Sequence, residues 1–185
     1  MTDTSTNKAL SEEDKKAITD GANWLSQWIT ERYNQGLLSH AEYNKAIDNL
    51  KNVKVYTTDK GYDRIVEALE NGELHFNDET IKRISKVYDK KHPFQGMLSA
   101  EETSMLAEMG LSFGNGNLTD EQKTIAYFKE YIENNPSSAG LMGFHYADLK
   151  EPVIFLNVDK QKQASDKETC PTLTSLAVHE MTHNL

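Results

Sequence analysis

The hydrophobic positions along the chain repeat mainly with the period of an α-helix. After Ser11, apolar side chains recur at helical spacing behind a run of acidic residues, which predicts a first helix ending near Gln35. A glycine follows, and Ser39 with Glu42 then matches a capping box that predicts a second helix. Residues 1–52 are therefore expected to form an N-terminal helical hairpin or extension.

Beyond this hairpin, the same rules predict more helices and a short strand. The segment from Val53 to Thr57 alternates as a half-buried strand does. Four segments have helical periodicity or a helix-starting motif: Asp63 to Leu69, the residues after Asn77 or Asp78, those after Ser99 and those after Thr119. The expected fold class is α+β, predominantly helical with a small mixed β-sheet.

The last part of the chain combines a strand pattern with a helix pattern. Residues 151–158 form a short run rich in β-branched and aromatic side chains, which predicts a strand. The polar residues 159–169 are expected to form a linker. A final helix follows, for which we expect Pro171 in the first turn and Thr169 or Cys170 at the N-cap.

This final helix contains the clearest chemical motif of the chain, a His-Glu-x-x-His pattern formed by His179, Glu180 and His183. Residues four apart lie on one face of a helix, so His179 and His183 can offer two imidazole nitrogens to a single Zn²⁺. Glu180 lies beside the first of them, where its carboxylate could take a proton from a metal-bound water. The motif predicts His179 and His183 as metal ligands and Glu180 as the catalytic base.

The surroundings of the motif favour the metal interpretation. Glu180 is the only formally charged side chain between Cys170 and Leu185, and the apolar residues of this segment are spread around the whole helix. Such a helix is expected to be buried. A carboxylate buried beside two imidazoles needs compensation, which a divalent cation would supply. In the competing interpretation, the histidines are ordinary hydrogen-bonded core residues.

The sequence leaves the third zinc ligand open, because a catalytic zinc site normally has three protein ligands and a water molecule. His145 and Asp148 are the best candidates within the chain, since they lie in an apolar, glycine-containing segment just before the expected strand. A structural, hydrogen-bonded role is the alternative for each. The chain also stops in mid-helix without a capping residue, which predicts a longer natural protein with a ligand after Leu185.

In its order of strand, polar linker and motif helix, the chain resembles the zincin metallopeptidases. The seven residues from His179 to Leu185 are similar to the opening of the metzincin signature His-Glu-x-x-His-x-x-Gly-x-x-His, with the Asn-Leu filling common in adamalysin-like members. The resemblance implies a zinc peptidase in which the motif helix forms the floor of the cleft. It also implies that the strand around Val153 to Val158 is an edge strand that binds an extended peptide by β-addition.

Composition and charge exclude several other classes. A net charge of -9 argues against nucleic-acid or anionic-membrane partners. Cys170 is the only cysteine, so no intrachain disulfide is expected. The chain has no apolar segment of membrane-spanning length, and Met1 to Asn7 lacks the basic and apolar regions of a Sec signal. We expect a cytoplasmic protein or one exported by a specialised secretion system, as a Ser/Thr/Asn-rich start is typical of both a flexible terminus and a bacterial effector.

Two functions follow from these observations. The first is a zinc-dependent endopeptidase acting on a protein or peptide, with a virulence effector favoured over a housekeeping enzyme. Its zincin-like catalytic domain would span residues 53–185 and be truncated just after the motif helix. The second is a catalytically silent zincin-like domain or helical adaptor that binds a protein partner through the acidic N-terminal hairpin.

Overall fold

The computed structural model of the protein describes residues 2–3, 10–92, 99–110, 118–135, 138, 140–164 and 171–185. Its contacts divide the chain into two compact units. The first unit comprises residues 1–64 and 137–185, and the second comprises residues 65–136. This division differs from the functional boundary predicted after residue 52, which stays a prediction.

The first unit combines a small sheet with the helices that contain the predicted motif and hairpin. Its strands are β1 (Thr2–Asp3), β2 (Lys54–Thr57), β3 (Gly143–Phe144) and β4 (Val153–Leu156). Its helices are α1 (Glu12–Asn34), α2 (His40–Asn52), α7 (Val158–Ala164) and α8 (Leu173–Thr182). The predicted α+β class, predominantly helical with a small mixed sheet, is confirmed.

The sheet has the strand order β1-β2-β4-β3. The first three strands in that order run parallel, and β3 runs antiparallel to β4, with Phe144 opposite Phe155. All four residues of β4 are buried. The expectation that this strand lies at the edge of the sheet and binds a peptide was wrong, because β2 and β3 already pair with its two sides. The edge strand on this side of the sheet is β3.

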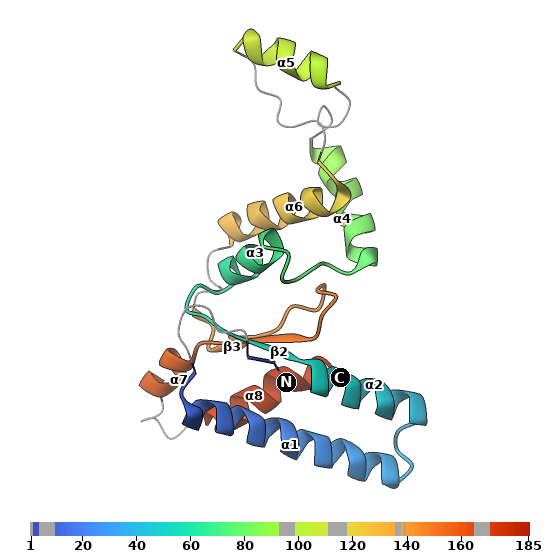
Figure 1. Cartoon of the computed structure of the whole chain (residues 1–185), viewed down its shortest axis with the longest axis vertical. Helices are drawn as coiled ribbons and strands as arrows, with labels where there is room; N and C mark the ends of the chain where they lie inside the picture. The colour runs from blue at the N-terminus through green and yellow to red at the C-terminus, as the bar shows by residue number, and fades with distance from the viewer. Residues whose placement is uncertain are drawn as a thin grey trace. The chain divides into compact units, whose positions relative to one another are not determined.

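Helix α8 lies between the sheet and α1 (Figure 1). Ile18, Leu25 and Ile29 of α1 share one buried core with Leu176 and Met181 of α8. The two helices approach closely at Gly21, where an added Cβ would lie 3.1 Å from the carbonyl oxygen of Thr174 and 3.1 Å from Cγ2 of Val178. The predicted N-terminal helix is therefore one wall of the core that holds the motif helix.

The predicted helical hairpin is confirmed by its boundaries. Helix α1 ends at Asn34, and Gly36 follows in the left-handed region with φ of 75°. Ser39 caps α2 in a full capping box, in which its hydroxyl accepts from the Glu42 N–H and the Glu42 carboxylate accepts from the Ser39 N–H. The turn therefore forms where the glycine and the capping box predict it.

Two predictions near the motif helix were wrong in detail. Residues 159–164 were expected to lie in a linker but belong to α7, which is stabilised by the Lys160 N–H donating to Oδ1 of Asn157 at 3.0 Å. The N-cap of α8 is Thr172, because its hydroxyl accepts from the Ser175 N–H at 3.1 Å. The helix thus begins after Thr172, and Pro171 precedes the cap. The predicted cap positions, Thr169 and Cys170, lie outside the described residues.

The second unit is helical in the part that the structure describes. Helix α3 (Asp63–Glu70) enters it, followed by α4 (Asp78–Lys91), α5 (Ala100–Glu108) and α6 (Asp120–Asn134). The predicted caps at Asn77, Ser99 and Thr119 are all present.

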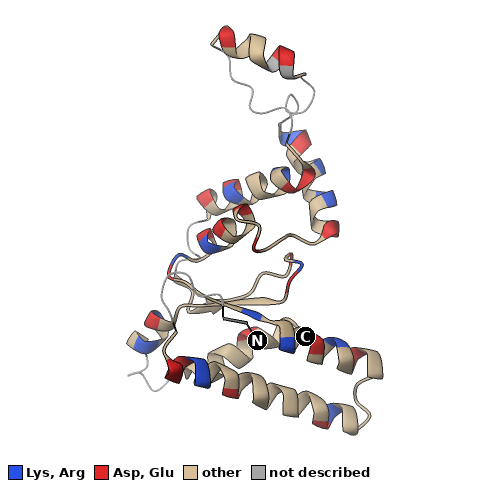
Figure 2. Cartoon of the chain, in the orientation of Figure 1, with Lys and Arg blue, Asp and Glu red and all other residues tan. Residues whose placement is uncertain are grey.

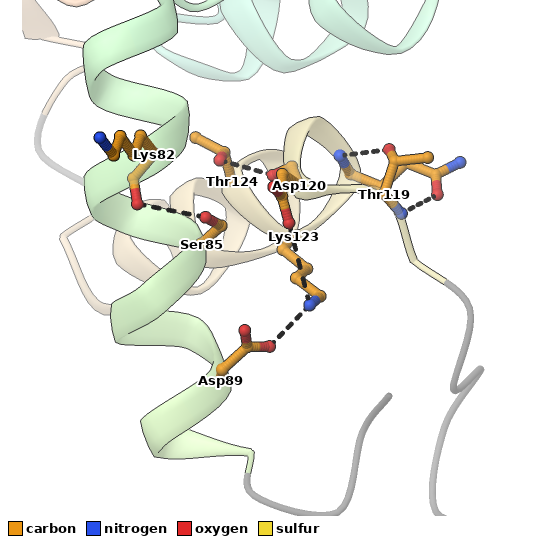
Figure 3. Close-up of polar contacts among 8 residues, drawn as sticks. Lys82, Ser85, Asp89, Thr119, Asp120, Lys123 and Thr124 are labelled. Carbon is orange, nitrogen blue, oxygen red and sulfur yellow. Dashed lines mark hydrogen bonds and ion pairs between the residues drawn. The ribbon is translucent and has the colours of Figure 1, made fainter. Parts of the chain in front are cut away.

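Helices α4 and α6 of this unit are held together by apolar and polar contacts. Phe76, just before α4, packs edge-on against Phe128 of α6 at 5.7 Å. Figure 3 shows the polar contact between the helices, where Lys123 Nζ lies 2.7 Å from Oδ1 of Asp89. Both helices contain acidic and basic residues, which are the red and blue segments of their ribbons in Figure 2. These helices therefore form a local core separate from that of the motif helix.

None of the described helices combines the length and apolar content needed to cross a membrane. With Cys170 as the only cysteine, the chain forms no intrachain disulfide.

Candidate metal centre

The motif helix α8 has a buried face and an exposed face. Leu176, Ala177 and Met181 are buried against the sheet and α1, whereas His179 and His183 are exposed. The helix is almost free of formal charge, as its mainly tan ribbon in Figure 2 shows. The expectation that this helix is buried all round was wrong, because the sheet and α1 cover only part of its circumference. The histidine face is accessible to a metal ion.

The two motif histidines lie on the same face, as their spacing predicts. Their ring centroids are 5.1 Å apart and the rings are nearly perpendicular, at 84°. His183 directly follows the last helical residue and continues the helical backbone, with φ of -65° and ψ of -18°. Both imidazoles, which come from one turn of a single helix, could therefore reach a metal ion placed between the two rings.

Glu180 is the buried member of the motif. Its side chain is on the inner side of α8, and the residue is only 5% exposed. Burial raises the pKa of the Glu180 carboxyl above its ordinary value, although the nearby His179 and His183 oppose this shift. Nδ1 of His145 lies 3.9 Å from Oε2 of Glu180, a contact that is an ion pair only when the imidazole is protonated. At this distance the carboxylate charge is only weakly compensated.

The edge strand β3 leaves room for this carboxylate at Gly143. A Cβ atom on Gly143 would lie 3.2 Å from Oε1 of Glu180 and 3.1 Å from Cδ1 of Leu176. The absence of a side chain at this position therefore lets β3 pass directly against α8. Sequence reasoning did not identify Gly143 as part of the site, because its neighbour on α8 is distant in the sequence.

His145 follows β3 and reaches the motif helix. Its ring stacks on that of His183, with centroids 4.0 Å apart and an angle of 9° between the ring planes. Burial, together with the neighbouring His183 and His179, lowers the pKa of His145. A lowered pKa favours the neutral imidazole, which is the form that binds metals.

The structure thus brings one of the two upstream candidates to the motif. Ligand atoms of His145, Glu180 and His183 all lie within 4.8 Å of one another. Imidazole nitrogen and carboxylate oxygen are ligand types that zinc accepts in proteins, so these residues fit a zinc ion. Asp148, the other candidate, is half-buried and does not belong to this group.

A cavity of about 480 Å³ elsewhere in the first unit is a weaker candidate site. It lies at the carboxyl ends of β2 and β4, and Asp14 and Lys162 line it. These two charges already pair, with Lys162 Nζ 2.9 Å from Oδ2 of Asp14. None of the motif residues lines this cavity, so we assign the candidate site to the exposed face of α8.

The chain matches no protein family, no curated protein and no solved structure.

Proposed function

We propose that this chain contains the catalytic centre of a zinc-dependent endopeptidase. His179 and His183 hold the metal, and Glu180 accepts a proton from the attacking water. The observation that supports this proposal is the combination, on one helix, of two exposed imidazoles with a carboxylate that is only 5% exposed. A buried carboxylate is costly unless a nearby cation compensates for it, and carboxyl groups with such a shifted pKa are typical of functional sites.

Glu180 has the properties that the proton-transfer step requires. A bound zinc ion would bring the pKa of a water molecule near neutrality and polarise a peptide carbonyl. Because burial raises the pKa of Glu180, its carboxylate is a stronger base than a solvated one. The protonated carboxyl can then deliver the proton to the amine that leaves when the peptide bond breaks.

The edge strand β3 provides a place for the substrate backbone. In the described part of the chain, β3 pairs with β4 on its inner side only. Its Gly143 lies against Glu180, so a peptide that adds to the outer side of β3 would run past the carboxylate. This arrangement supports an extended protein or peptide segment as the substrate, with β3 in the peptide-binding role that was expected of β4.

The test of this function is Glu180→Gln in the full-length protein. Because the carboxylate acts in proton transfer and not in ligation, zinc affinity should stay nearly unchanged, while kcat/KM should fall by about 10²- to 10⁴-fold. A fluorogenic peptide library would report turnover, and competition with a chelator would report affinity. Wild-type turnover in this variant would contradict the proposal.

A second candidate is the partner-binding module without catalysis. Trp24 and Trp28, one turn apart on α1, are 54% and 40% exposed, and such aromatic groups are enriched in protein interfaces. For this candidate, Trp24→Ala with Trp28→Ala should remove the biological effect of the protein, whereas His179→Ala with His183→Ala should preserve it. The reverse result would favour the peptidase.

A further inference from the structure

We infer that His145 is the third protein ligand of the metal, so that a residue upstream of the motif helix completes the centre. This inference rests on the proposed function, because it concerns the same metal ion. It assigns the ligand set His145, His179 and His183 and leaves Glu180 free to transfer protons. Three histidines are an established ligand set for a catalytic zinc ion that keeps an open position for water.

The backbone around His145 is fixed by aromatic packing. Phe144 stacks on Phe155 at 4.8 Å and meets Tyr62 edge-on at 5.2 Å. Tyr146 also contacts Tyr62, at 5.8 Å. In an extended backbone successive side chains point to opposite sides, so contacts of Phe144 and Tyr146 with one ring place His145 on the other side. The His145 ring accordingly lies against α8, where it stacks on His183.

The distances between the ligand atoms are close to those that a metal needs. Two nitrogens bound to one tetrahedral zinc at about 2.0–2.1 Å are about 3.4 Å apart. The ligand atoms of His145 and His183 lie within 4.8 Å of each other, with Glu180 in the same group. Side-chain rotations that bring the two nitrogens closer by up to about 1.4 Å would therefore let both imidazoles bind one ion.

His179 supplies the remaining ligand and decides the role of Glu180. Its ring is exposed and lies edge-on to His183 at 5.1 Å, but it is outside the group formed by His145, Glu180 and His183, so its side chain must turn to bind the same ion. A set of His145, Glu180 and His183 would instead consume the carboxylate as a ligand and leave no base beside the metal. The ligand role of Glu180 is therefore the competing arrangement that an experiment must separate from ours.

The test is a titration of the full chain with Co²⁺, whose visible absorption reports its ligands, followed by competition with Zn²⁺. The variants are His145→Ala, His179→Ala, His183→Ala and Glu180→Gln. His40→Ala is the matched control, since His40 is an exposed histidine of the same unit outside the group of ligands. X-ray absorption of the zinc-loaded wild-type chain gives the number of bound imidazoles independently of any variant.

We expect His145→Ala to weaken metal binding by more than about 100-fold, which exceeds the roughly 10- to 100-fold cost of losing a group that only supports a ligand. The wild-type chain should show three imidazoles, and His40→Ala and Glu180→Gln should bind the metal as the wild type does.

A loss of no more than about 100-fold in a folded His145→Ala chain, or two imidazoles in the wild type, would overturn the inference. A loss of binding in Glu180→Gln would also overturn it, in favour of the competing set. If His179→Ala and His183→Ala bind normally, the proposed function itself fails.

Discussion

At the scale of single residues, the centre is governed by the burial of Glu180. The carboxylate lies on the covered side of α8, with Nδ1 of His145 3.9 Å from its Oε2. Burial therefore costs free energy whenever Glu180 is ionised and no metal is bound. This cost produces a pH dependence that can be measured.

The metal-free chain should lose stability as the pH rises through the titration of Glu180. The pKa of Glu180 in the folded chain is raised above the ordinary value of 4.5. The protonated carboxyl therefore contributes its full stabilisation below pH 4.5, and this stabilisation is lost as the pH rises through the pKa of the folded chain. Glu180→Gln cannot ionise and should avoid this loss. Relative to the wild type, the variant should therefore gain in melting temperature with increasing pH, by about 2–4 °C for each 1 kcal/mol. Thermal unfolding with a chelator from acid to neutral pH would measure this, and a constant difference would contradict it.

Gly143 should affect catalysis through the position of Glu180. Gly143→Ala would place a Cβ 3.2 Å from Oε1 of Glu180 and displace the carboxylate. We expect kcat/KM to fall by up to about 10-fold, since a displacement of about 1 Å can cost 10²-fold and this contact requires a smaller one, with zinc affinity largely preserved. Gly140→Ala is the matched control, because its Cβ would meet only Nζ of Lys160 at 3.7 Å. Equal kinetics of the two variants would show that Gly143 has no positioning role.

At the scale of elements, the central feature is α8 held between the sheet and α1. The helix contributes Leu173, Leu176, Ala177 and Met181 to a core shared with α1, α2 and the sheet. Its capping residue Thr172 fixes its start, and the exposed histidine face is what remains after these contacts are made. The close contact between α1 and α8 at Gly21 is therefore part of what positions the metal ligands.

Gly21→Val should separate these helices. The added side chain would meet the Thr174 carbonyl and Val178, and overpacking of this kind costs about 1–3 kcal/mol. Gln27→Val places the same side chain at an exposed position of α1 and should change stability by less than about 0.5 kcal/mol. Urea unfolding of both variants would measure the difference. Similar midpoints would show that α1 adapts without cost.

At the scale of the whole molecule, the two compact units suggest which part of the chain the metal centre needs. Every residue of the proposed ligand set belongs to the first unit, as does α1. The chain enters and leaves the second unit near Tyr62 and Ser138, where the Tyr62 N–H donates to Oγ of Ser138 at 3.2 Å. A short connection could therefore replace the second unit.

Replacement of residues 65–136 by a short Gly/Ser linker should leave Co²⁺ affinity unchanged, because the first unit keeps its core and its ligands. Deletion of residues 1–52 should instead abolish Co²⁺ binding and produce an insoluble chain, because it removes α1 from the core around α8. Metal titration and circular dichroism of both proteins would test this. A soluble, metal-binding 53–185 chain would support the boundary that the sequence predicts after residue 52.

The sequence determined the features that depend on near neighbours. Helix starts at Ser39, Asn77, Ser99 and Thr119 follow from side chains that bond to backbone within three residues. The common face of His179 and His183 follows from helical periodicity. Such interactions have the same geometry in any fold, so the local pattern is sufficient to predict them.

Only the tertiary structure decided the features that join distant segments. It moved the edge of the sheet from β4 to β3, placed Gly143 against Glu180, and selected His145 over Asp148 beside the motif. It also left the histidine face of α8 open, although the apolar residues around that helix predict burial. The physical reason is that both features depend on packing between elements, which local spacing does not encode. These features are the order of the strands and the face of α8 that α1 and the sheet cover.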